Sequence, residues 1–284
     1  MATFFNQAIL SYNNNVTNSN IVTGELLEVL SATKTAVSES YSSGDAVTYI
    51  VSIVNSGSVA YTSLTLTDDL GAYSFGEGEL TPLDYEEGSV RYYINGELQA
   101  APEITAGPPL VITGISVPAN GNAIIVYSAR VNSFAPLTPE ATIVNTATIN
   151  GGGISTEIIA EEEIASESEP RLSITKSISP TSVVENGEIT YTFVIQNLGN
   201  TAADVGDNVI LTDIFDPILD ISSVVFNGVA WSSPEQYTYD ETTGLFTSVS
   251  GAITVPAAEF TQNEETGVWS VTPGVVVLTV AGTV

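Results

Sequence analysis

The 284-residue chain lacks cysteine and histidine altogether, and it has only 5 basic residues against 33 acidic ones, for a net charge of −28. Without cysteine it can form neither disulfides nor thiolate metal sites. Without histidine it lacks the usual proton shuttle and a common metal ligand. The acidic balance argues against nucleic acid and anionic membrane surfaces as partners. We therefore expect no cofactor, no metal and no nucleic-acid partner.

Long apolar runs are also absent, although 43% of the residues are hydrophobic. No stretch approaches the length of a membrane span. The opening residues, MATFFNQAIL, have neither a basic region nor a cleavage signal, so no secretory signal peptide is predicted. If the protein works outside a cell, we expect that it lost a leader or leaves by another route, such as lysis of the producing cell. No nucleophile–base pair or phosphate loop is visible, and we expect no enzymatic activity.

The residue pattern predicts an all-β protein. Val, Ile, Thr and Tyr dominate short alternating runs, which Gly, Asn, Ser, Asp and Pro interrupt. Strands are predicted near residues 30–37, 46–55, 62–68, 89–94, 97–100, 110–117, 122–131, 143–150 and 154–164 of the first half. Asn95-Gly96 is a strong signal for a type I′ hairpin turn. So many short strands favour Greek-key, immunoglobulin-like β-sandwiches.

The pattern occurs twice. Four pairs of residues of the same type lie 142 positions apart: Lys34 and Lys176, Tyr49 and Tyr191, Asn55 and Asn197, and Gly57 and Gly199. A period of this length indicates tandem domains rather than a solenoid. We assign residues 1–29 to an N-terminal extension, 30–164 to the first sandwich, 165–171 to a linker and 172–284 to the second sandwich.

The N-terminal extension resembles the end of the first domain. Residues 142–164 read as a strand, a Gly-rich turn and a second strand, and residues 3–27 repeat this pattern with Asn6 in the place of Asn145. In the first domain a loop leads from the closing strand into this final hairpin, and no such hairpin follows in the second domain. Because the chain starts with a segment that resembles a domain's final hairpin, and its second domain has no such hairpin, we predict that residues 3–27 form a donor hairpin. This hairpin would complete the second domain of a neighbouring copy.

Polar residues take inward positions on the predicted strands, since residues two apart share a face of a strand. They are Lys34, Asp68 and Asn145 in the first domain, Lys176 and Asp213 in the second, and Asn6 on the N-terminal hairpin. A buried ammonium without a partner costs on the order of several kcal/mol of folding free energy. Each lysine is therefore predicted to meet a polar partner in the core.

Five short motifs together carry a resemblance. They are L-x-x-T-K at residues 30–34, T-Y-x-x-x-x-x-N-x-G at 48–57, L-T-D at 66–68, N-G at 95–96 and V-N-T-A-T at 144–148. The second domain has all but the last, which stands in altered form at the N-terminus. The set resembles the conserved-repeat domain of bacterial and archaeal surface proteins, often called domain of unknown function eleven. The resemblance implies an immunoglobulin-like sandwich and an extracellular structural role.

Two interpretations of the inward residues stay open. One is a buried Lys–Asp ion pair, with Asn completing the hydrogen bonds. The other is a spontaneous isopeptide bond, as in similar pilin and adhesin domains of Gram-positive bacteria, where a Lys attacks an Asn side chain and a carboxylic acid shuttles the protons. By that resemblance Lys34 would bond to Asn145 with Asp68 as the shuttle. Lys176 would bond, with Asp213, to Asn6 of a neighbouring chain.

We expect a homopolymer: the structural subunit of a pilus-like filament, extracellular or on a cell or spore surface, assembled head to tail by donor-strand complementation. The alternative is a monomeric surface adhesin or ligand-binding module whose hairpin folds back on its own second domain.

Overall fold

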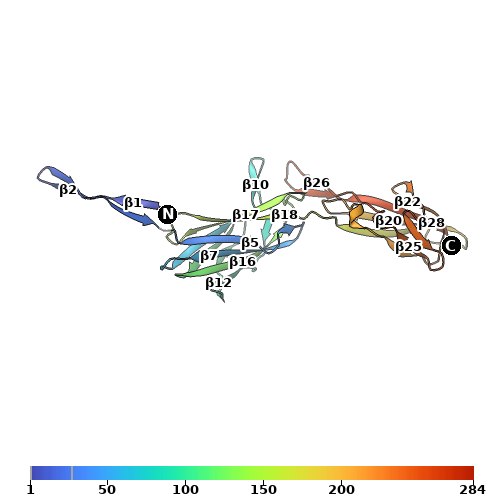
Figure 1. The fold of residues 1–284 in the computed structure, drawn as a ribbon, viewed down its shortest axis with the longest axis horizontal. Helices are drawn as coiled ribbons and strands as arrows, with labels where there is room; N and C mark the ends of the chain where they lie inside the picture. The colour runs from blue at the N-terminus through green and yellow to red at the C-terminus, as the bar shows by residue number, and fades with distance from the viewer. Residues whose placement is uncertain (1, 27) are drawn as a thin grey trace.

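The computed structural model describes residues 2–26 and 28–284 and consists almost entirely of β-strands (Figure 1). Over these residues the only helical segment is the 3₁₀ turn Val205–Asp207. The all-β prediction is therefore confirmed. An N-terminal hairpin, a first domain and a second domain follow one another along the longest axis of the molecule (Figure 1). In the described part of the chain no helix is long and apolar enough to cross a membrane.

The N-terminal hairpin (residues 2–26) extends away from the first domain (Figure 1). Its strands pair as β1 (Ala2–Asn6) with β4 (Val22–Leu26) and β2 (Ile9–Tyr12) with β3 (Asn15–Asn18). Asn13 and Asn14 form the tip with positive φ angles of 42° and 64°, which Asn tolerates better than most residues. The ring of Phe4 covers Gly24, where a Cβ atom would lie 2.3 Å from Phe4 Cζ.

The first domain is a sandwich of two sheets. The first sheet contains β13 (Glu97–Leu98), β12 (Arg91–Ile94), β16 (Gly121–Val131), β7 (Ala46–Asn55) and β5 (Leu30–Ala36), with β11 (Leu83–Tyr85) also on β16. The second contains β14 (Glu103–Thr105), β15 (Leu110–Val117), β8 (Tyr61–Asp68), β17 (Thr142–Gly151), β18 (Ile158–Ser166) and β6 (Ser40–Tyr41). A short hairpin of β9 (Tyr73–Phe75) and β10 (Gly78–Leu80) stands on the domain.

The sheets form because alternate residues of each strand are apolar and meet in one core. Val51, Ile53, Leu66, Ile125 and Ile149 are fully buried there. The turn between β12 and β13 is Asn95-Gly96, with φ angles of 48° and 83°. The hairpin signal read from the sequence is confirmed at this turn.

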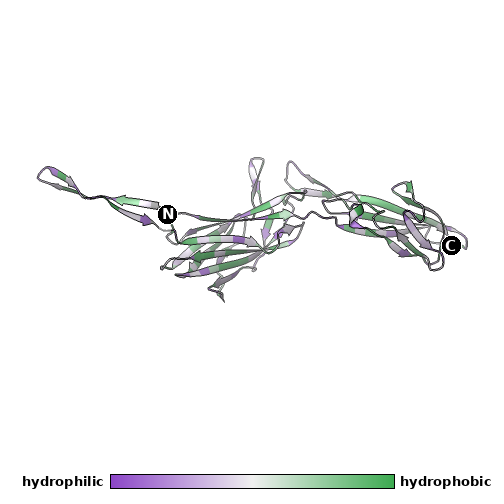
Figure 2. Cartoon of the chain, in the orientation of Figure 1, coloured by the Kyte–Doolittle hydropathy of each residue, from purple (hydrophilic) through white to green (hydrophobic). Residues whose placement is uncertain are grey.

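The second domain repeats this arrangement with fewer strands. One sheet contains β19 (Leu172–Ser179), β20 (Glu188–Asn197), β28 (Gly274–Thr283), β22 (Asp220–Phe226) and β23 (Val229–Ala230). The other contains β21 (Thr212–Ile214), β25 (Leu245–Ser248) and β24 (Tyr237–Asp240). A further hairpin pairs β26 (Glu259–Gln262) with β27 (Trp269–Thr272). Apolar residues line the strands of both domains (Figure 2).

The acidic stretch before the second domain lies mostly in a strand. β18 continues to Ser166, because Ala165 and Ser166 pair in parallel with Ser40 and Tyr41 of β6. β18 starts at Ile158 rather than at residue 154, since the preceding glycine-rich residues form the turn. Only residues 167–171 therefore connect the last strand of the first domain to β19.

Candidate cross-link sites and open groove

The first domain contains a buried ion pair between its two sheets. Lys34 on β5 points across the core to Asp68 on β8, with 2.8 Å between Lys34 Nζ and Asp68 Oδ2. Both side chains are fully buried. The Asp68 Oδ1 atom also accepts the backbone N–H of Leu70 at 3.1 Å. The structure thus brings together two of the residues that the sequence placed inward.

Asn145, the third predicted residue, reaches this pair through a tyrosine. Its side chain on β17 is buried, and Asn145 Nδ2 donates to the Tyr127 hydroxyl at 3.1 Å. Tyr127 in turn donates to Asp68 Oδ2 at 2.6 Å. Asn145 Oδ1 is buried and has no hydrogen-bond partner among the described residues.

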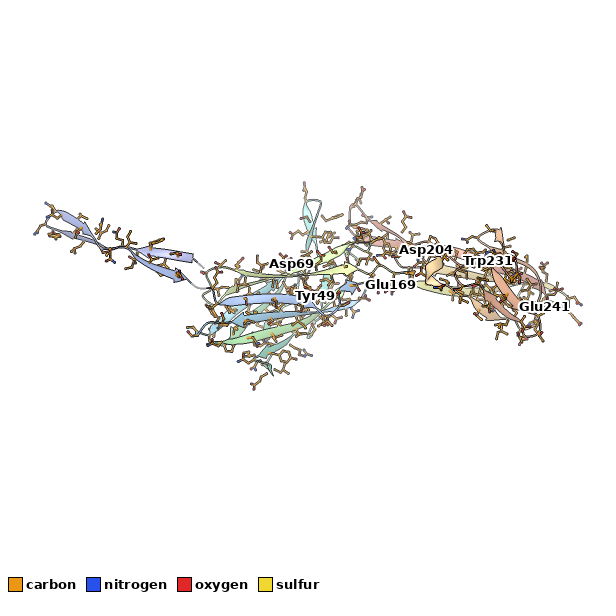
Figure 3. The ribbon with its side chains drawn as sticks, in the orientation of Figure 1. Tyr49, Asp69, Glu169, Asp204, Trp231 and Glu241 are labelled. Carbon is orange, nitrogen blue, oxygen red and sulfur yellow. The ribbon has the colours of Figure 1, made fainter. Side chains whose placement is uncertain are left out.

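The sequence interpretation missed Tyr127. Its position on β16 pairs with Tyr49 on β7, and the two rings stack with centroids 5.5 Å apart. Figure 3 shows where Tyr49 lies in the first domain. Alternation along β16 places Tyr127 on the inward face. That alternation was the available signal, but it does not say which inward residue faces Asp68 from the other sheet.

Burial shifts both groups of the pair toward their neutral forms. Desolvation lowers the pKa of Lys34, and the attraction of Asp68 only partly opposes it. Desolvation likewise raises the pKa of the Asp68 carboxyl, against the favourable charge of Lys34. A neutral amine is a nucleophile and a protonated acid can donate, so the site has the groups that amide exchange with Asn145 requires.

The second domain has the same ion pair in a more open setting. Lys176 contacts Asp213, with side-chain exposures of 37% and 19%. The Lys176 ammonium lies over aromatic rings, 4.3 Å from the centroid of Tyr191 and 5.4 Å from that of Phe215. Val280 pairs with Tyr191 in the same way that Tyr127 pairs with Tyr49. This domain therefore has no hydroxyl at the place that Tyr127 occupies.

Asn6 does not join Lys176 within the chain. It lies exposed on the N-terminal hairpin, and the first domain separates that hairpin from the second domain (Figure 1).

An open groove runs beside the Lys176–Asp213 pair. Every residue of β19 is exposed, including Leu172 at 39%, Ile174 at 54% and Ile178 at 38%. A cavity of about 290 Å³ between β19 and the segment before β21 has mostly apolar walls, among them Ile195, Leu211 and Ile253. β21 pairs with β25 on one side only, so its other edge has no partner strand among the described residues.

The first domain fills the corresponding place with its hairpin of β17 and β18. β17 pairs with the edge of β8 that faces away from β15, and there Ala147 lies opposite Asp68 and Ile149 opposite Leu66. The Glu162 carboxylate on β18 accepts the backbone N–H of Ala36 at 3.0 Å, which ties the hairpin to β5 across the sandwich. The β17–β18 hairpin therefore closes the gap that stays open in the second domain.

The N-terminal hairpin exposes apolar side chains on both faces. On the face that aligns with the buried face of the β17–β18 hairpin, Phe4 is 58% exposed, Leu10 62% and Val22 57%. Phe5, Ile9 and Ile21 are exposed on the other face. An apolar surface of this kind on an isolated hairpin is typical of a binding surface. No group of three or more acidic side chains in the described residues is arranged to hold a metal ion.

Comparison with known proteins gives only distant likenesses. No protein-family model and no curated protein matches the chain. The pilus backbone of Streptococcus pneumoniae is similar at 14% identity and a TM-score of 0.36, over 86% of this chain and 55% of that one. The major pilin subunit of Bacillus cereus is similar at 12% identity and a TM-score of 0.36, over 96% and 73% of the chains.

A collagen-binding domain from a Staphylococcus aureus adhesin is similar at 12% identity and a TM-score of 0.32, over 50% of this chain and 99% of that one. The chain thus spans little more than half the length of the pneumococcal protein. Because all these TM-scores are below 0.5, function is inferred from the chain's own geometry. The resemblance to the conserved-repeat domain stays a prediction.

Proposed function

We propose that the chain is the structural subunit of a surface fibre in which the N-terminal hairpin of one copy completes the second domain of the next. One observation carries the proposal: the same chain contains an exposed apolar hairpin and an open sandwich, and its first domain contains a similar hairpin in the matching gap. Strand addition satisfies the free edge of β21 and covers the apolar groove at once.

The register of the donor follows from the first domain. Aligning Asn6 with Asn145 places Ala8 opposite Asp213 and Leu10 opposite Leu211, as Ala147 and Ile149 lie opposite Asp68 and Leu66. Phe4, Ala8, Leu10 and Val22 then face the groove. A large apolar side chain that becomes fully buried contributes about 1.5–3 kcal/mol. Several of them, together with the new backbone hydrogen bonds, give a joint that opens slowly.

The direction of the hairpin favours a fibre over the folded-back adhesin. The hairpin projects from the end of the first domain that lies away from the second domain (Figure 1). Reaching its own groove would require it to turn back along the whole first domain. A neighbouring copy placed end to end presents its groove without such a turn. A contact between two different surfaces of the same chain propagates head to tail, which suits a fibre on the outside of a cell or spore.

The inward Lys, Asp and Asn residues support a covalent step in each domain. In the first domain the neutral Lys34 amine attacks Cγ of Asn145, and a new C–N bond forms while the original amide C–N bond breaks. Asp68 passes protons from the amine to the leaving nitrogen, which departs as ammonia, and Tyr127 holds the amide beside Asp68. In the fibre Lys176 does the same with Asn6 of the neighbouring copy, and Asp213 is the shuttle.

Electron microscopy of the purified protein tests the strand exchange. The wild type should form fibres, and a variant without residues 1–27 should form none, because its second domain stays open. A peptide of residues 3–27 added to this variant should raise the melting temperature of that domain. Fibres from the truncated variant, or a wild type that light scattering shows to be monomeric, would contradict the proposal.

The covalent step has its own readout on a denaturing gel after boiling. The wild type should run as a ladder, whereas Asn6→Ala and Lys176→Ala should run as monomers although both still form fibres. A boiled wild type that runs wholly as monomer would leave the strand exchange intact and remove the cross-link between subunits.

A further inference from the structure

The junction between the two domains buries Gly199 and Asn200 in a turn at the near end of the second domain, residues 198–202. Asn200 is only 7% exposed there. Its side-chain amide donates to the Leu137 carbonyl at 3.2 Å and to the Ser166 hydroxyl at 2.9 Å, both in the first domain. The far end of the first domain therefore covers this turn.

The first domain carries the same turn at its own near end, residues 56–60. In each domain one asparagine side chain, Asn55 or Asn197, holds the turn by donating to two backbone carbonyls. It also accepts the backbone N–H of Gly57 or Gly199, at 2.9 Å in both. Yet Ser58, which matches the buried Asn200, is exposed, and Val59 is 71% exposed. Ser58 and Val59 at the tip of this turn are therefore open to solvent in the described chain.

The opposite end of the second domain is uncovered as well. At the junction, a cavity of about 200 Å³ lies between residues 41–43 of the first domain and residues 198–200 of the second. The segment that matches residues 41–43 in the second domain is 183–185. There Val184 stands in the place of Ser42 and is 79% exposed.

The tethers at the two places are also alike. The backbone carbonyl of Arg171, just before the second domain, accepts the backbone N–H of Leu198 at 2.9 Å. The backbone carbonyl of Val29, just before the first domain, accepts the backbone N–H of Ser56 at 2.9 Å. β18 ends at Ser166 and β19 begins at Leu172, whereas β4 ends at Leu26 and β5 begins at Leu30, so the chain between the two strands is shorter in the second case. When the N-terminal hairpin is bound in a neighbouring subunit, this short connection keeps the neighbour's second domain close to the first domain that carries the hairpin.

We propose that residues 183–185 of one subunit face residues 56–59 of the next end to end, as residues 41–43 face residues 198–200 across the cavity at the junction between the two domains. The inference rests on the proposed strand exchange and names a second surface of the same joint. Val59, Val183 and Val184 give this contact an apolar character that Ser42 and Asn200 lack at the junction.

The junction has two supports that the joint lacks. One is the Leu137 carbonyl, which lies in the loop between β16 and β17. The other is the β26–β27 hairpin. The β26–β27 hairpin is inserted after Ala258, at the place where Asn120 in the first domain is followed directly by Gly121 and β16. It reaches the first domain, where the Trp269 backbone N–H donates to the Ser133 carbonyl at 2.8 Å and Gln262 Nε2 donates to the Tyr73 hydroxyl at 3.0 Å. Without a counterpart in the first domain, the joint depends on the two end turns and the tether.

Cross-linking tests the contact, since the chain has no cysteine of its own. The double variant Ser58→Cys/Val184→Cys is assembled and treated with a short bis-maleimide. This reagent reaches across a cavity such as the one at the junction, whereas a disulfide tolerates no more than roughly 7 Å between Cα atoms. Mass spectrometry of the digested fibres should find the peptides of residues 58 and 184 joined, and each single variant should give none. Fibres that depend on residues 1–27 but yield no such cross-link overturn the end-to-end contact alone.

A second pair of variants tests the same contact if the cysteine substitutions prevent assembly. Val184→Glu should slow fibre growth several-fold, and Val184→Glu/Ser58→Lys should recover most of the rate by pairing opposite charges. A Val184→Glu variant that grows as fast as the wild type overturns the contact. A wild type that forms no fibres overturns the strand exchange, and this inference with it.

Discussion

The two domains share one strand plan and one Lys–Asp pair, and they differ in what fills the gap between the first strand and the strand that carries the aspartate. In the first domain the β17–β18 hairpin fills it, and the Lys34–Asp68 pair is fully buried. In the second domain the gap is open, and the Lys176 side chain is 37% exposed. The closing hairpin, rather than the pair itself, therefore sets the burial of these charges.

The open gap is also lined with larger apolar residues than the closed one. Ile174 and Ile178 of β19 stand where β5 has Ala32 and Ala36. Apolar side chains that stay exposed contribute little to the stability of a free subunit, but they stabilise a complex that buries them. These larger side chains make the groove suited to receive a partner.

The largest expected effect comes from making the second domain like the first. A variant that carries residues 132–141 followed by a second copy of residues 2–26 after Val284 should close its own groove. A tethered hairpin has an effective concentration of about millimolar, far above that of free subunits in solution. Light scattering should then report monomers instead of fibres. The matched control carries Phe4→Asp and Leu10→Asp in the appended copy only and should still polymerise; fibres from both variants would contradict the strand exchange.

An intermediate effect is expected from removing the aspartate in each domain. Asp68→Ala leaves the Lys34 ammonium buried and unpaired, which should cost the first domain about 3–5 kcal/mol. Asp213→Ala, measured in subunits kept apart by Phe4→Asp/Leu10→Asp, should cost about 1 kcal/mol or less because its partner is partly solvated. Asp68→Ala should also restore the mass of one ammonia that the Lys34–Asn145 bond removes. Equal losses of melting temperature in the two domains would contradict the difference in burial.

The smallest expected effect is a pH dependence that separates a free Lys34 amine from an amide. Because burial lowers the pKa of Lys34, the unfolded chain binds the extra proton between that lowered pKa and the usual value. Stability therefore rises with pH across this window when the amine is free, by about 1.4 kcal/mol for each unit of lowering.

Denaturant titration of Asn145→Ala, which keeps the amine, should show this rise as the pH approaches the usual lysine pKa, and it is followed to about pH 9.5, below the range in which tyrosines ionise. The bonded wild type should show none. Asp68, whose raised pKa gives the opposite slope on the acidic side, is common to both proteins. Parallel rises in wild type and variant would return the site to a simple ion pair.

Sequence alone predicted the features that depend on local patterns. Alternation along the strands placed Lys34, Asp68 and Asn145 on inward faces, and all three are buried. The dipeptide Asn95-Gly96 predicted a hairpin turn, and both residues have the positive φ angles that this turn requires. The repeat of 142 residues predicted two domains, because each copy has the same strand and turn residues in the same order.

Tertiary structure decided what depends on strands that are distant in the chain. Only the pairing of β16 with β7 and the packing of the sheets bring Tyr127 between Asn145 and Asp68. The reach of the β26–β27 hairpin onto Ser133 depends likewise on how the two domains meet. A strand's own sequence fixes which side chains share a face, whereas the partner across the core is fixed by sheet register and packing, which no short stretch of sequence contains.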